Sequence, residues 1–424
     1  MVYNRTMNNE KILTAFNKQF NEFYYTPKDL EYGAVPGTFL SPFEYAQLLE
    51  YKENVASVDN PKVRLLPLVS FNSPGLYLSE CRELSLMMGS YKLLQNVGFD
   101  LGDRFSKHFM ESRIYSEVEG TLNIENVPTT RKRLSELLDD NAPALNRNDI
   151  IIKNMKEGID FVHSLPAFTK ANLFKLYSLL SKDCLDEENR LKPGDFYRYD
   201  SVEIAGYHGC PASRIDECMN SLFSYVNSVL NEKNPYDLLL LPHICHYYIL
   251  YVHPYFDYNG RTARMVSYWI YLLSGLDYFP PIVSEAINQT KARYYQAIEL
   301  SRDAHNDLTY FIIYLFNITI DYVLCYENIS QMERECKSRG IILTETELSY
   351  IKRILICYEG AFTYTDFLTM AGISISKQGA LKILNRFTDY GLLKEVATSS
   401  KYKLFDINSE RIPYFTRNYG YRKP

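Results

Sequence analysis

The sequence has no Cys-x-x-Cys pair, no long uninterrupted hydrophobic run and no excess of basic residues. Its eight cysteines are scattered, which argues against a zinc ribbon or a redox pair and favours reduced thiols used as small core residues. The two most apolar stretches, Leu238–Val252 and Tyr310–Tyr326, are shorter than the roughly 18–20 residues of a membrane span, so no membrane partner is predicted. The first residues contain no apolar signal core, and we expect a cytoplasmic protein.

The composition excludes two further classes of protein. Hydrophobic residues make up 46% of the 424 positions and charged residues 23%, which excludes a largely disordered chain. The net charge of −5 excludes a chain that coats nucleic acid along its whole length. Residues 343–424 differ from the rest, because twelve Lys and Arg against eight Asp and Glu give them a charge of +4. A mildly basic module therefore follows an acidic body.

Helical spacing of apolar residues dominates the body of the chain. A change of period at Arg190–Gly206, with a turn at Pro193-Gly194, predicts a β-hairpin among the helices. A stop is expected at Glu119-Gly120-Thr121. The class is mainly α, with expected regions 1–100, 101–338 and 339–424. Helices are predicted over Leu76–Val97, Arg104–Val118, Asn148–Ser164, Lys170–Leu185, Pro211–Leu230, Tyr236–Tyr251, Gly260–Ser274, Asn288–Asp303 and Leu308–Lys337.

The last region reads as three helices followed by two short strands. The helices are expected at Glu345–Tyr358, Tyr364–Ala371 and Ser376–Tyr390, and the strands at residues 391–396 and 401–407. This order is typical of a winged helix. Its basic side chains could contact DNA phosphates, or the module could instead bind a protein or form a homodimer. These side chains are Lys377, Lys382, Arg386, Lys401 and Lys403.

One segment carries a concentration of chemistry, HPYFDYNGRTAR at residues 253–264. His253 titrates near neutrality and could accept a proton from a hydroxyl, and Asp257 is a hard oxygen ligand suited to Mg²⁺. Asn259-Gly260 lets backbone amides point at an anion where a helix begins, and Arg261 and Arg264 could grip a polyphosphate. Such a set suits transfer of a nucleotide's phosphoryl group. The alternative is a solvated loop before a core helix, with its charges in salt bridges.

The same segment resembles the signature of the Fic family, H-P-F-x-D/E-G-N-G-R-x-x-R, at seven of its nine specified positions. Tyr255 replaces the usual Phe and Tyr258 the usual first Gly. The resemblance extends over roughly Arg104–Tyr322 and implies a helical bundle with a β-hairpin flap. If the replaced glycine has a positive φ, Tyr258 costs on the order of 1–3 kcal/mol of strain. It could narrow the site, favour another nucleotide or leave little activity.

The resemblance implies a role for each matching residue. His253 would be the general base that deprotonates a target Ser, Thr or Tyr hydroxyl, and Asp257 would hold Mg²⁺. Asn259 and the amides around Gly260 would bind the α-phosphate of ATP. Arg261 and Arg264 would hold the outer phosphates, and Tyr258 would stand beside them.

Three other segments resemble further parts of the family. The hairpin resembles the flap that pairs with the target protein, with Arg198, Val202 and Ile204 in place. Tyr295, after Tyr294, resembles a residue near the adenine. Glu119-Gly120 resembles the inhibitory pattern S/T-x-x-x-E-G/N, with Tyr115 at the Ser/Thr position. This resemblance implies that Glu119 pairs with Arg264 and keeps ATP from binding productively.

We therefore expect a Fic-type adenylyltransferase that transfers AMP from ATP to a protein hydroxyl. Two alternatives stay open, namely a catalytically weak regulator that binds DNA or a protein through the winged helix, and an enzyme that removes AMP. His243 and His246 have a spacing that could suggest a metal site. They lie in an apolar helix without a clear third ligand, so we expect them to pack in the core.

Overall fold

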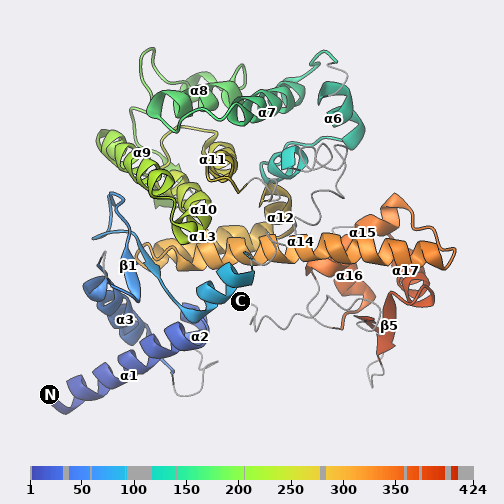
Figure 1. The fold of residues 1–424 in the computed structure, drawn as a ribbon, viewed down its shortest axis with the longest axis horizontal. Coiled ribbons are helices and arrows are strands. Elements are labelled where there is room, and N and C mark those ends of the chain that lie inside the picture. The colour runs from blue at the N-terminus through green and yellow to red at the C-terminus, as the bar shows by residue number, and fades with distance from the viewer. Residues whose placement is uncertain are drawn as a thin grey trace. The chain divides into compact units, whose positions relative to one another are not determined.

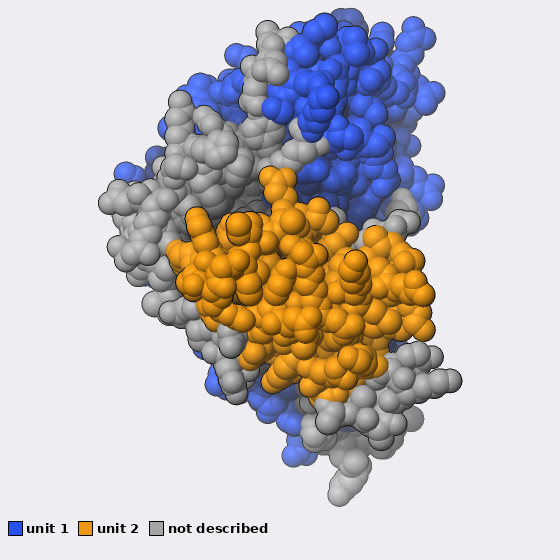
Figure 2. Space-filling view, turned by 90° about the vertical axis from the view of Figure 1, so that its right-hand side faces the viewer, with its two compact units in different colours: residues 1–317 blue, residues 318–424 orange. Residues whose placement is uncertain are grey.

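The computed structural model is built mainly of α-helices, which confirms the predicted class (Figure 1). It describes residues 2–31, 38–57, 60–90, 92, 117–138, 142–204, 206–276, 283–357, 361–371, 375–396 and 403–408. Within this part, the strands form two-stranded antiparallel sheets. The chain separates into two compact units, residues 1–317 and 318–424, which Figure 2 colours blue and orange.

The chain begins with the helices α1 (Val2–Asn21), α2 (Pro27–Glu31) and α3 (Pro42–Val55). α3 starts at a capping box, in which Ser41 accepts from the backbone N–H of Glu44 and the Glu44 carboxylate accepts from that of Ser41. Two strands, β1 (Val63–Leu65) and β2 (Tyr77–Ser79), then pair with each other.

The helix predicted from Leu76 is wrong over its first residues, because Tyr77–Ser79 are a strand and the helix occupies residues 82–90. All three strand residues are buried. The backbone of Tyr77 also exchanges hydrogen bonds with Asn306 and Leu308, more than 200 residues away. Pairing with distant segments thus outweighed the local helical spacing.

The centre of the larger unit is a bundle in which α10 packs against both α9 and α11. Almost every residue of α10 after Leu238 is buried, and Trp269 of α11 lies fully buried against Phe168. Apolar residues all round α10 thus make it the core of the bundle. The helices are α6 (Arg131–Leu138), α7 (Arg147–His163), α8 (Lys170–Ser181), α9 (Ile215–Glu232), α10 (Pro235–Val252) and α11 (Asn259–Leu273).

Both histidines of α10 are core residues, as predicted. His243 Nε2 lies 3.1 Å from the hydroxyl of Tyr271, and His246 Nε2 lies 2.9 Å from that of Tyr294. Among the described residues, no cluster of His, Cys, Asp and Glu could hold a metal ion by itself.

The predicted helix over Asn288–Asp303 is divided, since α12 (Val283–Gln289) ends before Thr290 and α13 (Lys291–Asp303) follows it. The stop expected at Glu119-Gly120-Thr121 is wrong, because residues 117–124 are helical. Gly120 lies so close to α12 that a Cβ there would come within 2.6 Å of the backbone nitrogen of Glu285. The helix predicted at Arg104–Val118 lies almost entirely outside the described residues.

The hairpin is real but lies later than predicted. Its strands are β3 (Glu203–Ile204) and β4 (Tyr207–His208), and Gly206, with a φ of +80°, is in the turn between them. The predicted turn at Pro193-Gly194 is a turn without paired strands. Two short 3₁₀ segments, η1 (Glu187–Asn189) and η2 (Ala212–Arg214), precede and follow this region.

The smaller unit has the predicted order of helices and strands. Its core gathers Phe367, Leu384, Phe387 and Phe405, all fully buried. The long helix α14 (Thr309–Ser338) contributes its last turns, and the other elements are α15 (Glu345–Cys357), α16 (Tyr364–Ala371), α17 (Lys377–Asp389), β5 (Leu393–Val396) and β6 (Leu404–Ile407).

Two expectations about composition can be checked on the described residues. None of their helices is long and apolar enough to cross a membrane. The cysteines at 81, 184, 210, 218, 245 and 336 are free and buried, as predicted for thiols that serve as small core residues.

Candidate active site

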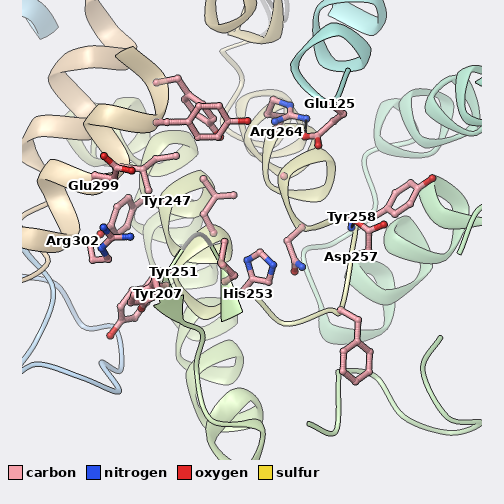
Figure 3. A pocket seen from close by; sticks show the side chains of 18 residues that line it. Glu125, Tyr207, Tyr247, Tyr251, His253, Asp257, Tyr258, Arg264, Glu299 and Arg302 are labelled. Carbon is pink, nitrogen blue, oxygen red and sulfur yellow. Dashed lines mark hydrogen bonds and ion pairs between the residues drawn. The ribbon is translucent and has the colours of Figure 1, made fainter. Parts of the chain in front are cut away.

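A cavity of about 310 Å³ lies in the larger unit, where the loop after α10 leads into α11 (Figure 3). It brings together most of the residues that the sequence singled out. The predicted residues that line it are His253, Asp257, Tyr258, Asn259, Gly260, Arg264, Ile204 and Tyr295. Arg198, Val202, Arg261 and Glu119 are not among the lining residues.

The loop between α10 and α11 is held in a fixed shape by left-handed backbone at both ends. His253 has a φ of +53° and Tyr258 a φ of +67°. Between them, the Asn259 side chain accepts from the backbone N–H of Tyr255 at 3.0 Å and donates to its carbonyl at 2.8 Å. The Asn259 amide predicted to bind phosphate is thus engaged in locking the loop.

His253 lies near the middle of the cavity in Figure 3. Burial, and then the nearby Arg198 guanidinium, lower the pKa of His253 to about 4. Both causes disfavour the imidazolium form. The ring can therefore accept a proton at neutral pH, as a general base must.

Arg198 positions this loop from the flap side. It is buried, and its guanidinium donates to the carbonyls of His253, Asp200 and Cys210, with 2.7 Å from Nε to the His253 oxygen. Gly209 permits this close approach, because a Cβ there would lie 3.1 Å from Arg198 Nη2. Arg198 was predicted to belong to the flap that docks a target, and the structure shows its side chain buried and hydrogen-bonded to the loop.

The other two residues of the predicted flap lie close to the cavity or to Gly209. Ile204 lines the cavity from β3, and the carbonyl of Val202 accepts from the backbone N–H of Gly209 at 3.1 Å. The flap therefore lies directly over the His253 end of the loop.

Asp257 places a carboxylate on the cavity wall, with Oδ1 accepting from the backbone N–H of Tyr258 at 2.6 Å. One carboxylate does not form a metal cage. It does suit Mg²⁺, which proteins often bind through one or two carboxylates together with phosphate oxygens and water. The donor set thus fits a magnesium ion that arrives with a nucleotide.

Arg264 is paired with Glu125, and this corrects the predicted pairing with Glu119. Arg264 Nη2 lies 2.5 Å from Glu125 Oε1, and Nε donates to Thr121 Oγ1 at 2.9 Å. Burial raises the pKa of Glu125, but the charge and hydrogen bond of Arg264, together with the charges of Arg261 and Lys291, hold it below its ordinary value. The carboxylate stays ionised. It also lies at the start of α11, because a Cβ on Gly260 would come within 2.8 Å of Glu125 Oε1.

The sequence contained a signal for this pairing that the prediction missed. Thr121, Glu125 and Asn126 fit the pattern S/T-x-x-x-E-G/N at every specified position. Glu119-Gly120 fits only at its last two, and the half-buried Glu119 is one and a half turns earlier on the same helix.

Arg261 was predicted to bind phosphate, but it is not among the residues that line the cavity. Its guanidinium carbon lies 3.5 Å from the centre of the Tyr258 ring. The residue is only 7% exposed, and Nε and Nη1 are buried without a hydrogen-bond partner. Tyr258 therefore contacts and positions one of the two arginines of the motif.

The end of the cavity away from Arg264 and Glu125 was not predicted. In Figure 3, Glu299, Tyr247 and Arg302 lie at the end away from Arg264 and Glu125. Tyr251 connects the cavity to residues 70–72. It lines the cavity, and its hydroxyl forms hydrogen bonds with the Ser70 hydroxyl, the backbone N–H of Phe71 and the Asn72 side chain. No motif marks these residues, because they come together only when α10, α13 and the flap pack.

Known proteins resemble this part of the chain. Residues 167–271 match the model of the Fic/DOC family. The curated protein adenylyltransferase fic-1 of Caenorhabditis elegans is 38% identical over 72 residues, 17% of this chain and 13% of that protein. Protein adenylyltransferase Fic of Drosophila willistoni is 22% identical over 159 residues, 36% of this chain and 30% of that protein. The matches thus span less than a third of these relatives.

Solved structures are similar over a longer stretch. A Fic family protein from Desulfovibrio desulfuricans has a TM-score of 0.47 and 19% identity, covering 77% of this chain and 96% of that one. A fragment of Fic-1 from C. elegans has a TM-score of 0.43 and 18% identity, covering 57% and 71%.

Proposed function

We propose that the chain transfers AMP from ATP to a hydroxyl of a target protein. The match of residues 167–271 to the Fic/DOC family supports this proposal. The observation that supports this proposal most is that one cavity contains a neutral His253, the Asp257 carboxylate and the first turns of α11 with Arg264. The adenylyltransferase names of the curated relatives support AMP as the transferred group.

His253 acts as the general base in this proposal. A target Ser, Thr or Tyr hydroxyl gives its proton to the imidazole while its oxygen forms a bond to the α-phosphorus. The bond from that phosphorus to the oxygen bridging to the β-phosphate breaks, and pyrophosphate leaves with the electron pair. A positioned base of this kind contributes about 10²–10⁴-fold to rate.

Asp257 would hold Mg²⁺, and a bound ion would neutralise charge on the phosphate oxygens. The start of α11 would receive a phosphate, because backbone N–H groups point outward from a helix N-terminus. Tyr295, 45% exposed at the cavity wall, supports the placement of the nucleoside toward α13.

Glu125 inhibits the enzyme in this proposal, in place of Glu119. Its carboxylate occupies the Arg264 guanidinium and lies at the start of α11. An anion already in this position repels an incoming phosphate and denies it a charge-assisted hydrogen bond. Loss of the Glu125 carboxylate should therefore activate the enzyme.

The flap provides the place for the target segment. β3 and β4 pair only with each other among the described residues, so the outer edge of the hairpin has backbone groups available for an added strand. Ile204 lies where such a strand would pass between the flap and His253.

The test uses the full chain with Mg²⁺ and ATP labelled at the α-phosphate, followed by autoradiography and intact mass. We expect strong self-labelling of Glu125→Ala, with a mass increase of one AMP. The double variant Glu125→Ala/His253→Ala should lose at least about 100-fold of this rate.

Glu119→Ala is the matched control for the inhibitory carboxylate. It should label no faster than the unmodified chain, because Arg264 pairs with Glu125. Equal labelling with and without His253 would overturn the mechanism. No labelling of any variant, with release of AMP from a pre-labelled protein, would favour the alternative in which the same site removes AMP.

A further inference from the structure

We propose that Tyr258 is a specificity-determining residue, which withholds Arg261 so that the cavity takes a nucleoside monophosphate in preference to a triphosphate. The inference rests on the proposed function in one respect, namely that the cavity is a nucleotide site. It goes beyond that function by naming which nucleotides the resting site accepts and which side chain decides this.

The first step is the state of the two arginines of α11. Arg264 lines the cavity, but its guanidinium is paired with Glu125. Arg261 does not line the cavity, and its guanidinium is stacked on the Tyr258 ring. Neither cation is therefore available to the outer phosphates of a triphosphate. The Glu125 carboxylate holds Arg264, and the Tyr258 ring holds Arg261.

The second step is the cost of this arrangement. Nε and Nη1 of Arg261 are buried with no hydrogen-bond partner. The Arg261 charge helps to lower the pKa of Glu125, but among the described residues no carboxylate oxygen lies within ion-pair distance of Arg261. A buried guanidinium with unsatisfied donors is unfavourable unless another contact compensates, and the ring face of Tyr258 is the contact that the structure offers. The donors remain ready for a phosphate once the ring is gone.

The third step is the position of Tyr258 itself. It has a φ of +67°, in the left-handed region that a tyrosine adopts at a cost and a glycine does not. The backbone of the loop thus has the shape that a glycine would give it, and the side chain is the only addition. Tyr258 is one of the residues that line the cavity, and its ring contacts the Arg261 guanidinium.

A single phosphate meets a different environment from a triphosphate. Glu125 at the start of α11 repels any phosphate there, but a single phosphate bound with Mg²⁺ at Asp257 needs neither Arg261 nor a second arginine. The second and third phosphates need additional cations, and Tyr258 has taken one of these. Phosphate number is therefore the property that Tyr258 should control.

The experiment measures binding of AMP and of ATP by calorimetry, with Mg²⁺, to the full chain. We expect the unmodified chain to bind AMP at least as tightly as ATP. Tyr258→Gly should tighten ATP binding about tenfold, the scale of a buried cation–π contact, and change AMP binding less than twofold. Tyr258→Phe keeps the ring and should behave like the unmodified chain. Tyr258→Asn, which tolerates left-handed backbone, repeats the test if the glycine variant does not fold.

Arg261→Ala separates this role from a general loosening of the loop. It should weaken ATP binding less than twofold in the unmodified chain and about tenfold in the Tyr258→Gly background. A gain that survives without Arg261, or a Tyr258→Phe variant that behaves like Tyr258→Gly, would overturn the inference. If no variant binds either nucleotide, including Glu125→Ala, the proposed function itself has failed. If ATP binds and transfer occurs but Tyr258→Gly changes nothing, only this inference has failed.

Discussion

The cavity of the larger unit and the helix-and-strand module of the smaller unit use charged residues in opposite ways. At the cavity, the Arg264 side chain is 2% exposed and bonded to Glu125. In the module, Lys403 and Glu395 also form an ion pair, but their side chains are 48% and 49% exposed. Both regions contain several basic residues, so the sequence alone does not show which of them are buried or paired.

The difference shows where charge costs free energy. Burying a guanidinium costs free energy of folding, so we expect a buried arginine only where packing or function requires it. An exposed ion pair changes the free energy of folding very little. In the module, Arg386 pairs with Glu347 and Lys394 with Asp406, so much of its positive charge is already matched within the chain. The cavity therefore carries the stronger indication of a binding site.

The largest expected effect concerns the two ion pairs. Arg264→Ala should lower the free energy of unfolding by about 3 kcal/mol, because it leaves the Glu125 carboxylate without its buried partner. Lys403→Ala should lower it by less than about 1 kcal/mol. Urea unfolding of both variants checks the comparison, and equal losses would remove it.

The next effect concerns two asparagines. Asn259→Ala should cost about 2 kcal/mol, since it breaks two buried hydrogen bonds to the backbone of Tyr255. Asn385→Ala in α17 should cost less than about 0.5 kcal/mol, because Asn385 is exposed and its contact with Lys403 is 3.5 Å long. Thermal unfolding of the two variants measures both costs. A loss of similar size in each would mean that the loop is not locked by Asn259.

The pH dependence of transfer sharpens the same contrast. Burial and Arg198 lower the pKa of His253 from 6.5 to about 4, so the unfolded chain takes up this proton first as pH falls. Stability linked to His253 is complete above about pH 6.5 and is lost as pH falls towards 4. We expect the transfer rate of Glu125→Ala to stay level from about pH 7.5 to 5.5. A rate that halves near pH 6.5 would contradict the burial of this base.

The smallest effect is expected for DNA. Binding of duplex DNA by the full chain, measured by fluorescence anisotropy at low and moderate salt, should be weak. Lys382→Ala should change it less than twofold, because the neighbouring cations Arg386 and Lys403 are paired with carboxylates. Tight binding whose affinity falls steeply as the salt concentration rises would instead indicate that DNA is a partner of this module.

Local patterns predicted the helical elements well because apolar spacing and turn residues act over a few positions. α7, α8 and α10 agree with the predicted helices to within a few residues. The strand at Tyr77–Ser79 failed because its hydrogen bonds come from Val63–Leu65 and from Asn306, which no local window contains. The hairpin was found but misplaced, since two turn signals with positive φ, at Gly194 and Gly206, lie twelve residues apart.

The sequence by itself determined the resemblance to the Fic family and the set of reactive groups, because the residues from His253 to Arg264 are consecutive and their order predicts a loop leading into a helix. Only the tertiary structure decided the state of those groups. Glu125 reaches Arg264 because its helix packs on α12, and Arg261 lies under Tyr258 because the loop holds the tyrosine in left-handed backbone. Pairing and burial depend on segments far apart in the chain, and a linear pattern carries no measure of either.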